Sequence, residues 1–269
     1  NPWAITQEKY YGYNRDWRQE VLINLKAGYA PFESLRFDFS VAPKVNFLTN
    51  KLYSNQINYY DADEVLRNTS PQKRSIDMTK GYTLNADIKL LANFNKSFNN
   101  HNFSALGGFQ QITNYYEYLS AHREGSLFNY EEFASFPTIN QTGNGNSNEW
   151  ALQSYFGRIN YNFAGKYLLE ANIRYDGSSR FAKGYQWGKF PSFSVGWRFS
   201  QEDFMQNIDW LSDGKLRTSW GQLGNQLGVG YYDFAMNINL NQAAVFNQQV
   251  ADGYAAVNYA VKDLTWETT

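Results

Sequence analysis

Few residues in this chain have the chemistry of a catalytic group. Cysteine is absent, which excludes disulfides, thiolate metal sites and cysteine nucleophiles. Histidine occurs only as His101 and His122, and no Gly-x-Ser-x-Gly sequence accompanies them. Because His101 falls on an expected short turn, only His122, near a long loop, could join a triad assembled from distant strands. The sequence therefore offers no catalytic residues that we would assign.

Two loop motifs could bind ions or phosphates. Asp61-Ala62-Asp63-Glu64 carries carboxylate oxygens of the kind that calcium prefers, although a solvated acidic loop is the simpler interpretation. The glycine-rich Gly224–Gly230 is similar to a phosphate-binding loop, but it follows no buried strand and opens no helix. We therefore expect neither a metal nor a cofactor.

A third group of residues could contact a solute. Arg174, Asp176 and Arg180 fall at the mouth of an expected long loop, where salt bridges that fix the loop base are the alternative. Trp187 and the tyrosines Tyr115, Tyr116 and Tyr118 could stack on sugar rings, with a membrane girdle or loop packing as the alternative.

The elements that must position these residues are strands. From Ser154 to Phe199 apolar and polar residues alternate, as in Tyr167–Tyr175, and a period of two indicates a β-strand whose two faces differ. A soluble sheet can alternate in the same way. Charged residues in mid-strand, and aromatic residues on both sides of a smaller aliphatic middle, favour a membrane barrel. Eight residues at ~3.3 Å each span about 26 Å, or roughly 20 Å after tilting, close to the height of an outer-membrane apolar band.

The parity of this pattern predicts the strand register, because cross-strand neighbours share a face. We expect the pairs Phe163 with Tyr167, Ile159 with Ala171, Tyr155 with Tyr175, Asn160 with Glu170, and Arg158 with Asn172. A slip of one residue would place arginines in lipid at roughly 2–4 kcal/mol each. Odd-numbered residues of these strands should therefore face lipid and even-numbered ones a polar lumen.

The chain is expected to form about eight antiparallel strands. They are Val21–Tyr29, Leu35–Val41, Tyr82–Ala92, Phe103–Tyr118, Trp150–Phe163, Tyr167–Tyr175, Phe190–Phe199 and Lys215–Gln222. Gly107 and Gly108 suggest a bulge or bend within the fourth strand. Such a chain should not close into a barrel by itself, because the interior of an eight-stranded barrel would hold only side chains.

The connections between these strands alternate in length. The long ones are Ala42–Lys80, Leu119–Glu149, Asp176–Lys189 and Leu223–Asp263. The others are shorter, and apolar spacing predicts a short helix over Gln201–Leu211. In an antiparallel meander every second connection lies on the same side, so the long loops should share one rim, the extracellular one.

Composition agrees with a barrel. Aromatic residues make up 18% of 269 residues although the mean hydropathy is −0.59, and no run of about eighteen apolar residues could form a transmembrane helix. A net charge of −1 gives no reason to expect a nucleic-acid partner. The chain begins without methionine or a signal peptide, and we expect a new strand to begin at Leu264–Thr269. We therefore expect a mature or partial portion of a longer protein.

Several segments together resemble one family. Tyr167–Phe181, Phe190–Arg198 and Lys215–Gln226 resemble the barrel of SusC/RagA-type TonB-dependent transporters of Bacteroidota, and Asn1-Pro2-Trp3 and Leu264–Thr269 fit the same family. The resemblance implies a barrel of about 22 strands in the outer membrane of a Gram-negative bacterium, of which residues 1–269 would be one internal part. The plug, the TonB box and the C-terminal strands would lie outside this chain.

The resemblance also implies a function. It is TonB-dependent import of a large nutrient, an oligosaccharide or a peptide, with a SusD-like surface lipoprotein and the TonB complex as partners. Interface cores favour aromatic anchors, so we expect the lipoprotein contact at Tyr130, Phe133, Phe136, Tyr231 and Tyr232 in the long loops. The alternatives are an outer-membrane barrel hydrolase that uses His122, and a soluble β-sandwich that binds carbohydrate.

Overall fold

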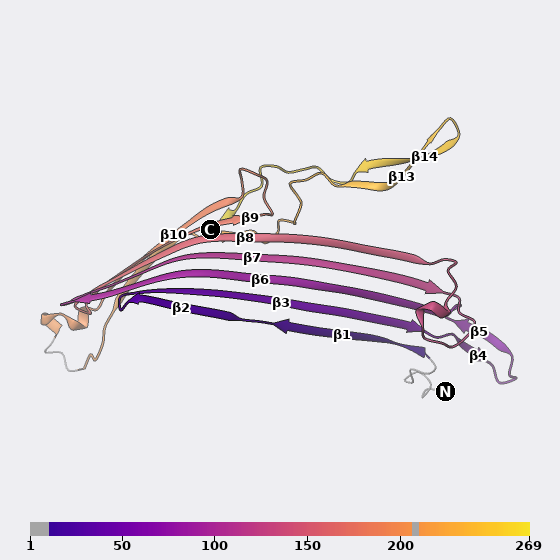
Figure 1. Ribbon diagram of the computed structural model, residues 1–269, viewed down its shortest axis with the longest axis horizontal. Coiled ribbons are helices and arrows are strands. Elements are labelled where there is room, and N and C mark those ends of the chain that lie inside the picture. Colours follow the sequence, from indigo (N-terminus) through magenta and orange to yellow (C-terminus); the bar gives the residue numbers. More distant parts are fainter. Residues whose placement is uncertain (1–10, 206–209) are drawn as a thin grey trace. The chain divides into compact units, whose positions relative to one another are not determined.

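The computed structural model describes residues 11–205 and 210–269 (Figure 1). The chain divides into two compact units. The first unit comprises Asn1–Ile23, Pro43–Asn85 and Asn114–Glu149, and the second comprises Asn24–Ala42, Ala86–Thr113 and Trp150–Thr269. Several long strands contribute residues to both units.

The main element is one nine-stranded sheet with the order β1-β3-β6-β7-β8-β9-β10-β11, in which β2 also pairs with β3. Its strands are β1 (Gly12–Leu22), β2 (Leu25–Phe32), β3 (Leu35–Ser54), β6 (Ser75–Phe98), β7 (His101–Glu124), β8 (Thr142–Phe163), β9 (Tyr167–Ser178), β10 (Trp187–Trp197) and β11 (Leu216–Gly221). Consecutive strands are neighbours, and the sheet has two edges, as expected for a chain that does not close on itself.

Smaller elements lie in the connections. Three two-stranded sheets pair β4 (Ile57–Tyr60) with β5 (Leu66–Ser70), β12 (Gly224–Asn225) with β15 (Glu267–Thr268), and β13 (Ile238–Phe246) with β14 (Gln249–Ala256). Short 3-10 helices are η2 (Phe133–Ser135), η3 (Phe199–Gln201) and η4 (Asp203–Met205). No helix among the described residues is long and apolar enough to cross a membrane.

Most strands are longer than the alternation predicts. β6 and β7 have 24 residues each and β3 has 20, so the connections after β3 and β7 are shorter than expected. Backbone hydrogen bonds continue past the last alternating residue, because ladder pairing does not require an apolar side chain. The expected first strand, Val21–Tyr29, is instead two strands separated at Ile23 and Asn24, both paired with β3.

The bulge or bend expected at Gly107 and Gly108 stays a prediction, because β7 is one continuous strand through both residues and a strand can contain a bulge. Two further expectations need correction. The helix expected over Gln201–Leu211 is replaced by the single turns η3 and η4, and its residues 206–209 lie outside the described part. At the end of the chain only Glu267 and Thr268 form a strand, and it pairs with β12 within this chain.

Connections of similar length lie together within each unit. In the second unit the short turns meet, since Ala164 N donates to Asn100 O at 2.7 Å and Arg198 N to Lys166 O at 2.8 Å. In the first unit the long connection that leads into β6 and the one that follows β7 meet at the ends of these two adjacent strands, where Gly125 N donates to Arg74 O at 2.8 Å (Figure 1). That all four long loops share one rim stays a prediction.

Candidate functional site

The two faces of the sheet differ, as the parity predicts. In the second unit the register pairs Tyr155 with Tyr175, Ile159 with Ala171 and Arg158 with Asn172. Large apolar side chains at odd positions are exposed, among them Ile173 at 54% and Phe193 at 50%. We call the side with the odd-numbered side chains of β8, β9 and β10 the outward face, and the other side the polar face.

A hydrogen-bond network covers the polar face. Arg158 Nε donates to Asn172 Oδ1 at 2.7 Å, and Asn172 Nδ2 donates to Glu170 Oε1 at 3.0 Å. On the neighbouring strands Asn160 Nδ2 donates to Ser104 Oγ at 3.3 Å. These groups satisfy one another within β9 and across neighbouring strands, as buried and half-buried polar groups usually do.

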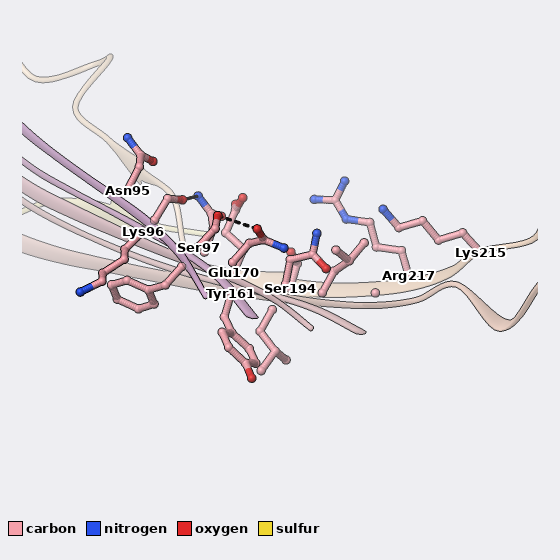
Figure 2. A pocket seen from close by; sticks show the side chains of 16 residues that line it. Asn95, Lys96, Ser97, Tyr161, Glu170, Ser194, Lys215 and Arg217 are labelled. Atoms are coloured by element: carbon pink, nitrogen blue, oxygen red, sulfur yellow. Dashed lines mark hydrogen bonds between the residues drawn. The ribbon is translucent and has the colours of Figure 1, made fainter. Parts of the chain in front are cut away.

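A groove of 470 Å³ lies on this sheet near the short turns, and we call it the turn-end groove (Figure 2). Its polar lining includes Asn95, Ser97, Glu170, Ser194, Lys215 and Arg217. Tyr161 points away from Asn95 and Arg217, which places it on the outward side of the wall (Figure 2). A second hollow of 640 Å³ is lined by Arg158, Glu170, Arg174, Ser192 and Arg217 among others. Polar hollows of this size can receive another segment of protein or a hydrophilic solute.

The turn-end groove carries excess positive charge. Lys215 and Arg217 line it and are exposed, and neither forms an ion pair or a hydrogen bond with any residue in 11–205 or 210–269. The acidic residue of the groove, Glu170, already accepts the hydrogen bond from Asn172. A carboxylate or another anionic group is therefore the chemical complement of this groove.

Arg174, which is half-exposed, pairs with the buried Asp176 at the other end of the polar face. Arg174 Nε lies 2.8 and 2.7 Å from the two carboxylate oxygens of Asp176, and Arg174 Nη2 donates to Ser154 Oγ at 2.9 Å. Asp176 and Ser154 are 7% and 1% exposed. This geometry fits the alternative in which the pair fixes the loop base, because the carboxylate is covered.

Phe156 is an aromatic residue on the polar parity of β8, and two neighbours accommodate it. Arg174 pairs with it in the register, and Arg174 Cζ lies 5.5 Å from its ring centroid. On β7, a Cβ added to Gly108 would lie 2.3 Å from the ring. Gly108 therefore makes room for Phe156 and does not mark a break in the strand.

Arg180 joins two loop segments. Its Nη1 donates to Val229 O at 2.7 Å, and its Cζ lies 4.6 Å from the ring centroid of Tyr231 and 5.8 Å from that of Trp150. Tyr232 packs edge-on against Tyr231 at 6.4 Å and is 41% exposed. Arg180 thus holds the segment after β12 against the loop after β9, and it leaves Tyr232 at the surface.

Trp187 lies on the outward face. It stacks on Tyr175 with ring centroids 4.6 Å apart and on Tyr155 at 6.0 Å. The three rings come from adjacent strands, an arrangement typical of an aromatic girdle at a membrane interface. This position fits the girdle alternative for Trp187.

A second aromatic cluster was not expected from the sequence. Phe181 and Phe190 are buried, and each ring centroid lies 5.4 Å from that of Trp266. Trp266 Nε1 also donates to Gln186 O at 2.8 Å. One feature of the sequence could have indicated part of this cluster: Phe190 is an aromatic residue at an even position of β10, whereas the other aromatic residues of that strand are at odd positions. The cluster anchors the end of the chain to the loop between β9 and β10.

In the first unit the loop between β7 and β8 carries three of the expected contact residues. Phe136 is 3% exposed in a core with Tyr13, Tyr53 and Ile76, and Phe133 packs against that core. Tyr130 is 61% exposed. The sequence analysis did not select Leu127 and Phe128, which are 85% and 73% exposed in the same loop. Only the exposed side chains can touch a partner without rearrangement of the loop.

The motifs for ion binding and catalysis have structural explanations. Asp61 Oδ1 accepts hydrogen bonds from the backbone of Asp63 and Val65 at 3.0 and 2.9 Å, and these bonds together with the Arg67 guanidinium lower the pKa of Asp61. His122 Nδ1 lies 2.7 Å from Asp77 Oδ1. Across the described ranges no three His, Cys, Asp or Glu side chains are grouped to hold a metal ion.

Comparisons with known proteins agree with this architecture. The family described as "TonB dependent receptor-like, beta-barrel" matches residues 1–269. The chain is 36% identical over 183 residues to TonB-dependent receptor P39 of Formosa agariphila, covering 66% of this chain and 17% of that protein. It is 49% identical over 75 residues to TonB-dependent receptor SusC of Bacteroides thetaiotaomicron, covering 28% of this chain and 8% of SusC. The chain therefore spans about a sixth of the length of its P39 relative.

A solved structure has the same fold. The structure of the RagAB peptide transporter superposes with a TM-score of 0.82 over 95% of this chain and 27% of that chain, at 21% identity. The relatives named here are TonB-dependent receptors, and the superposed structure is that of a peptide transporter. This chain belongs to the TonB-dependent receptor β-barrel family and is of the SusC/RagA type.

Proposed function

We propose that this chain forms part of the wall of an importer that brings a large nutrient, an oligosaccharide or a peptide, through the outer membrane with energy from the TonB complex. The separation of a hydrogen-bonded polar face from an exposed apolar face carries this proposal. A lipid-facing wall around an aqueous path requires that separation. Residues 1–269 would be one part of a single barrel domain, with the plug and the TonB box elsewhere in the protein.

The polar face would border the transport path. The turn-end groove presents Lys215 and Arg217 without partners in the described part of the chain, so it suits an acidic segment of the plug. The solute would meet the polar side chains along β8, β9 and β10 once the plug is displaced. No bond is made or broken in this function, which needs only binding and release.

The long loops would meet a SusD-like lipoprotein. This proposal rests on the similarity of the chain to RagAB, which is described as a peptide transporter, and to the TonB-dependent receptor SusC. The exposed Leu127, Phe128, Tyr130 and Tyr232 form our revised contact set. Phe133 and Phe136 would hold the loop in place from within.

Uptake by living cells tests the import function. The transporter gene that contains this chain is deleted, and growth is measured on defined oligosaccharides and on defined peptides as sole nutrient, with and without an intact TonB system. We expect the deletion strain to lose growth on one nutrient class. A strain that keeps the transporter gene but lacks the TonB system should lose growth on that class to the same extent. Unchanged growth on every polymer, with normal growth on the monomers as control, would refute import of these solutes.

Co-purification tests the lipoprotein contact. The variant Leu127→Ser/Phe128→Ser removes two exposed apolar side chains and leaves the buried core around Phe136 intact. Hot-spot losses of at least about 2 kcal/mol would weaken binding roughly thirtyfold. The matched control is Phe204→Ser, which removes an exposed aromatic side chain from the connection before β11. Equal co-purification of all three proteins would exclude this loop from the interface.

A further inference from the structure

The outward face of the second unit contains an apolar groove of 420 Å³. Tyr29, Phe37, Phe39 and Phe109 are its large side chains, and Ala92 and Gly107 are small residues between them. The register places Tyr29 opposite Phe37. A Cβ added to Gly107 would meet no atom within 4 Å, so the space above this glycine is open. The groove exists because small residues on β6 and β7 lie among aromatic residues of adjacent strands.

The residues of β6 indicate where the groove lies relative to the edge of the membrane's apolar band. Leu90, Ala92, Lys96 and Phe98 have the same parity and so share the outward face. Lys96 follows Ala92 by four residues, about 13 Å along the strand at ~3.3 Å per residue and roughly 10 Å along the membrane normal after tilting. Because this distance is less than half of the ~30 Å hydrocarbon thickness, a Lys96 at the edge of the apolar band places Ala92 and the groove inside that band.

Aromatic residues mark that edge. Phe98 stacks on His101 with ring centroids 4.9 Å apart, and His101 also lies 4.8 Å from Phe163. His101 Nδ1 forms a 2.7 Å hydrogen bond with Tyr161. Rings with a polar group, grouped beside the short turns, are typical of the headgroup level of a membrane.

Lys96 lies between the groove and these rings. Lys96 is one of the residues that line the turn-end groove, but its side chain points away from Asn95 and toward the side of Tyr161 (Figure 2). Among the described residues it has no ion pair or hydrogen bond, and it is exposed. A lysine in this position can extend its ammonium group to a lipid phosphate while its methylenes stay in the apolar region.

From these observations we propose that the groove is a binding site for one phospholipid of the periplasmic leaflet. One acyl chain fills the space above Gly107 and Ala92, and Lys96 pairs with the phosphate. The apolar lining excludes a polar ligand, and the groove is continuous with the lipid-facing surface of the wall. The pairing of an apolar hollow with a cation at headgroup depth distinguishes this site from the general lipid annulus.

Native mass spectrometry of the delipidated transporter, titrated with 1-palmitoyl-2-oleoyl-phosphatidylethanolamine, tests the site. Gly107→Phe fills the open space, and Lys96→Gln removes the cation. Ala171→Phe is the matched control, because Ala171 is exposed on the outward face of β9, outside the groove. Gly107→Phe should weaken the tightest lipid adduct by at least about tenfold, since loss of even two methylene contacts has that effect. Lys96→Gln should weaken it severalfold, and Ala171→Phe should leave it unchanged.

Three results would overturn the proposal. The first is full retention of the adduct in Gly107→Phe, and the second is an equal loss in Ala171→Phe, which would indicate annular lipid only. The third is a change in oligomeric state in Gly107→Phe with unchanged lipid binding, because a second copy of the protein would then occupy the groove. Retention of the adduct in Lys96→Gln would refute the contact between Lys96 and the lipid phosphate. This result does not depend on whether the Gly107→Phe variant inserts into the membrane. None of these readouts depends on nutrient uptake.

Discussion

Arg174 shows how a charge is held in a wall that borders both lipid and water. It binds a carboxylate two residues along its own strand and a serine on the neighbouring strand. Two charge-assisted hydrogen bonds converge on Asp176, whose side chain is only 10% exposed. The arrangement keeps the buried carboxylate paired, which matters because an isolated buried charge is costly.

Replacement of Arg174 by methionine should therefore destabilise the barrel. We expect a loss of about 1–3 kcal/mol in the free energy of unfolding, because Asp176 would lose its charged partner. Urea unfolding in detergent micelles measures this difference. The matched control is Arg158→Met, since Arg158 is exposed and donates only to Asn172. If both variants lose the same stability, burial of the carboxylate is not the cause.

Gly108 and Phe156 give a second prediction at this scale. Gly108→Ala would place a Cβ 2.3 Å from the Phe156 ring, so we expect a destabilisation of about 1–3 kcal/mol from overpacking. Phe156→Ala in the same protein should recover most of that loss. Gly107→Ala, whose Cβ meets open space, is the neighbouring control and should be near neutral. The same urea titration distinguishes these outcomes, and an unaffected Gly108→Ala variant would contradict the proposed role of this glycine.

At the scale of elements, the connection from β10 to β11 is fixed by one acidic residue. Glu202 accepts a hydrogen bond from Trp197 Nε1 at 2.9 Å and one from Lys166 Nζ at 3.2 Å. These hydrogen bonds, with that of Trp197 first, lower the pKa of Glu202, whereas the pKa of Lys166 is raised chiefly by its bond to Glu202. The carboxylate thus joins the turn after β8 to η3 and η4.

The pH dependence of stability should report this contact. Because the folded-state pKa of Glu202 is lowered, its stabilisation is complete above the ordinary glutamate value of about 4.3 and is lost as the pH falls through the folded-state pKa. Melting temperatures measured from pH 7 to pH 3 should therefore fall more steeply for the native protein than for Glu202→Gln. Asp203→Asn, which changes an exposed neighbour, is the control. Parallel curves for native protein and Glu202→Gln would show that the contact does not contribute.

At the scale of the whole molecule, the outward face should contact lipid and the polar face should contact water. The chain contains no cysteine, so single cysteines can be introduced into a cysteine-free background. Ser192→Cys and Phe193→Cys are adjacent on β10 but have opposite parity. We expect a water-soluble maleimide to label Ser192→Cys in membranes at least about tenfold faster, because the other thiol lies against lipid. Equal labelling in membranes, with equal labelling in urea as the control, would contradict the assignment of the faces.

The sequence by itself determined the strand type, the register of β8 with β9 and the two faces of β9 and β10. These features follow from a period of two and from the cost of placing arginine in lipid, and both are properties of neighbouring residues. The pair Arg158 with Asn172 was predicted in this way, and so was the exposure of Ile173.

Only the tertiary structure decided features that depend on residues distant in the chain. The burial of Phe136 needs Tyr53, and the burial of Phe190 is shared with Trp266. The even position of Phe190 shows that it departs from the outward face, but it does not show that Trp266 covers it. The tolerance of Phe156 on the polar face depends on Gly108 of another strand. The extent of β3, β6 and β7 also escaped prediction, because backbone ladder bonds extend a strand without any pattern in its side chains.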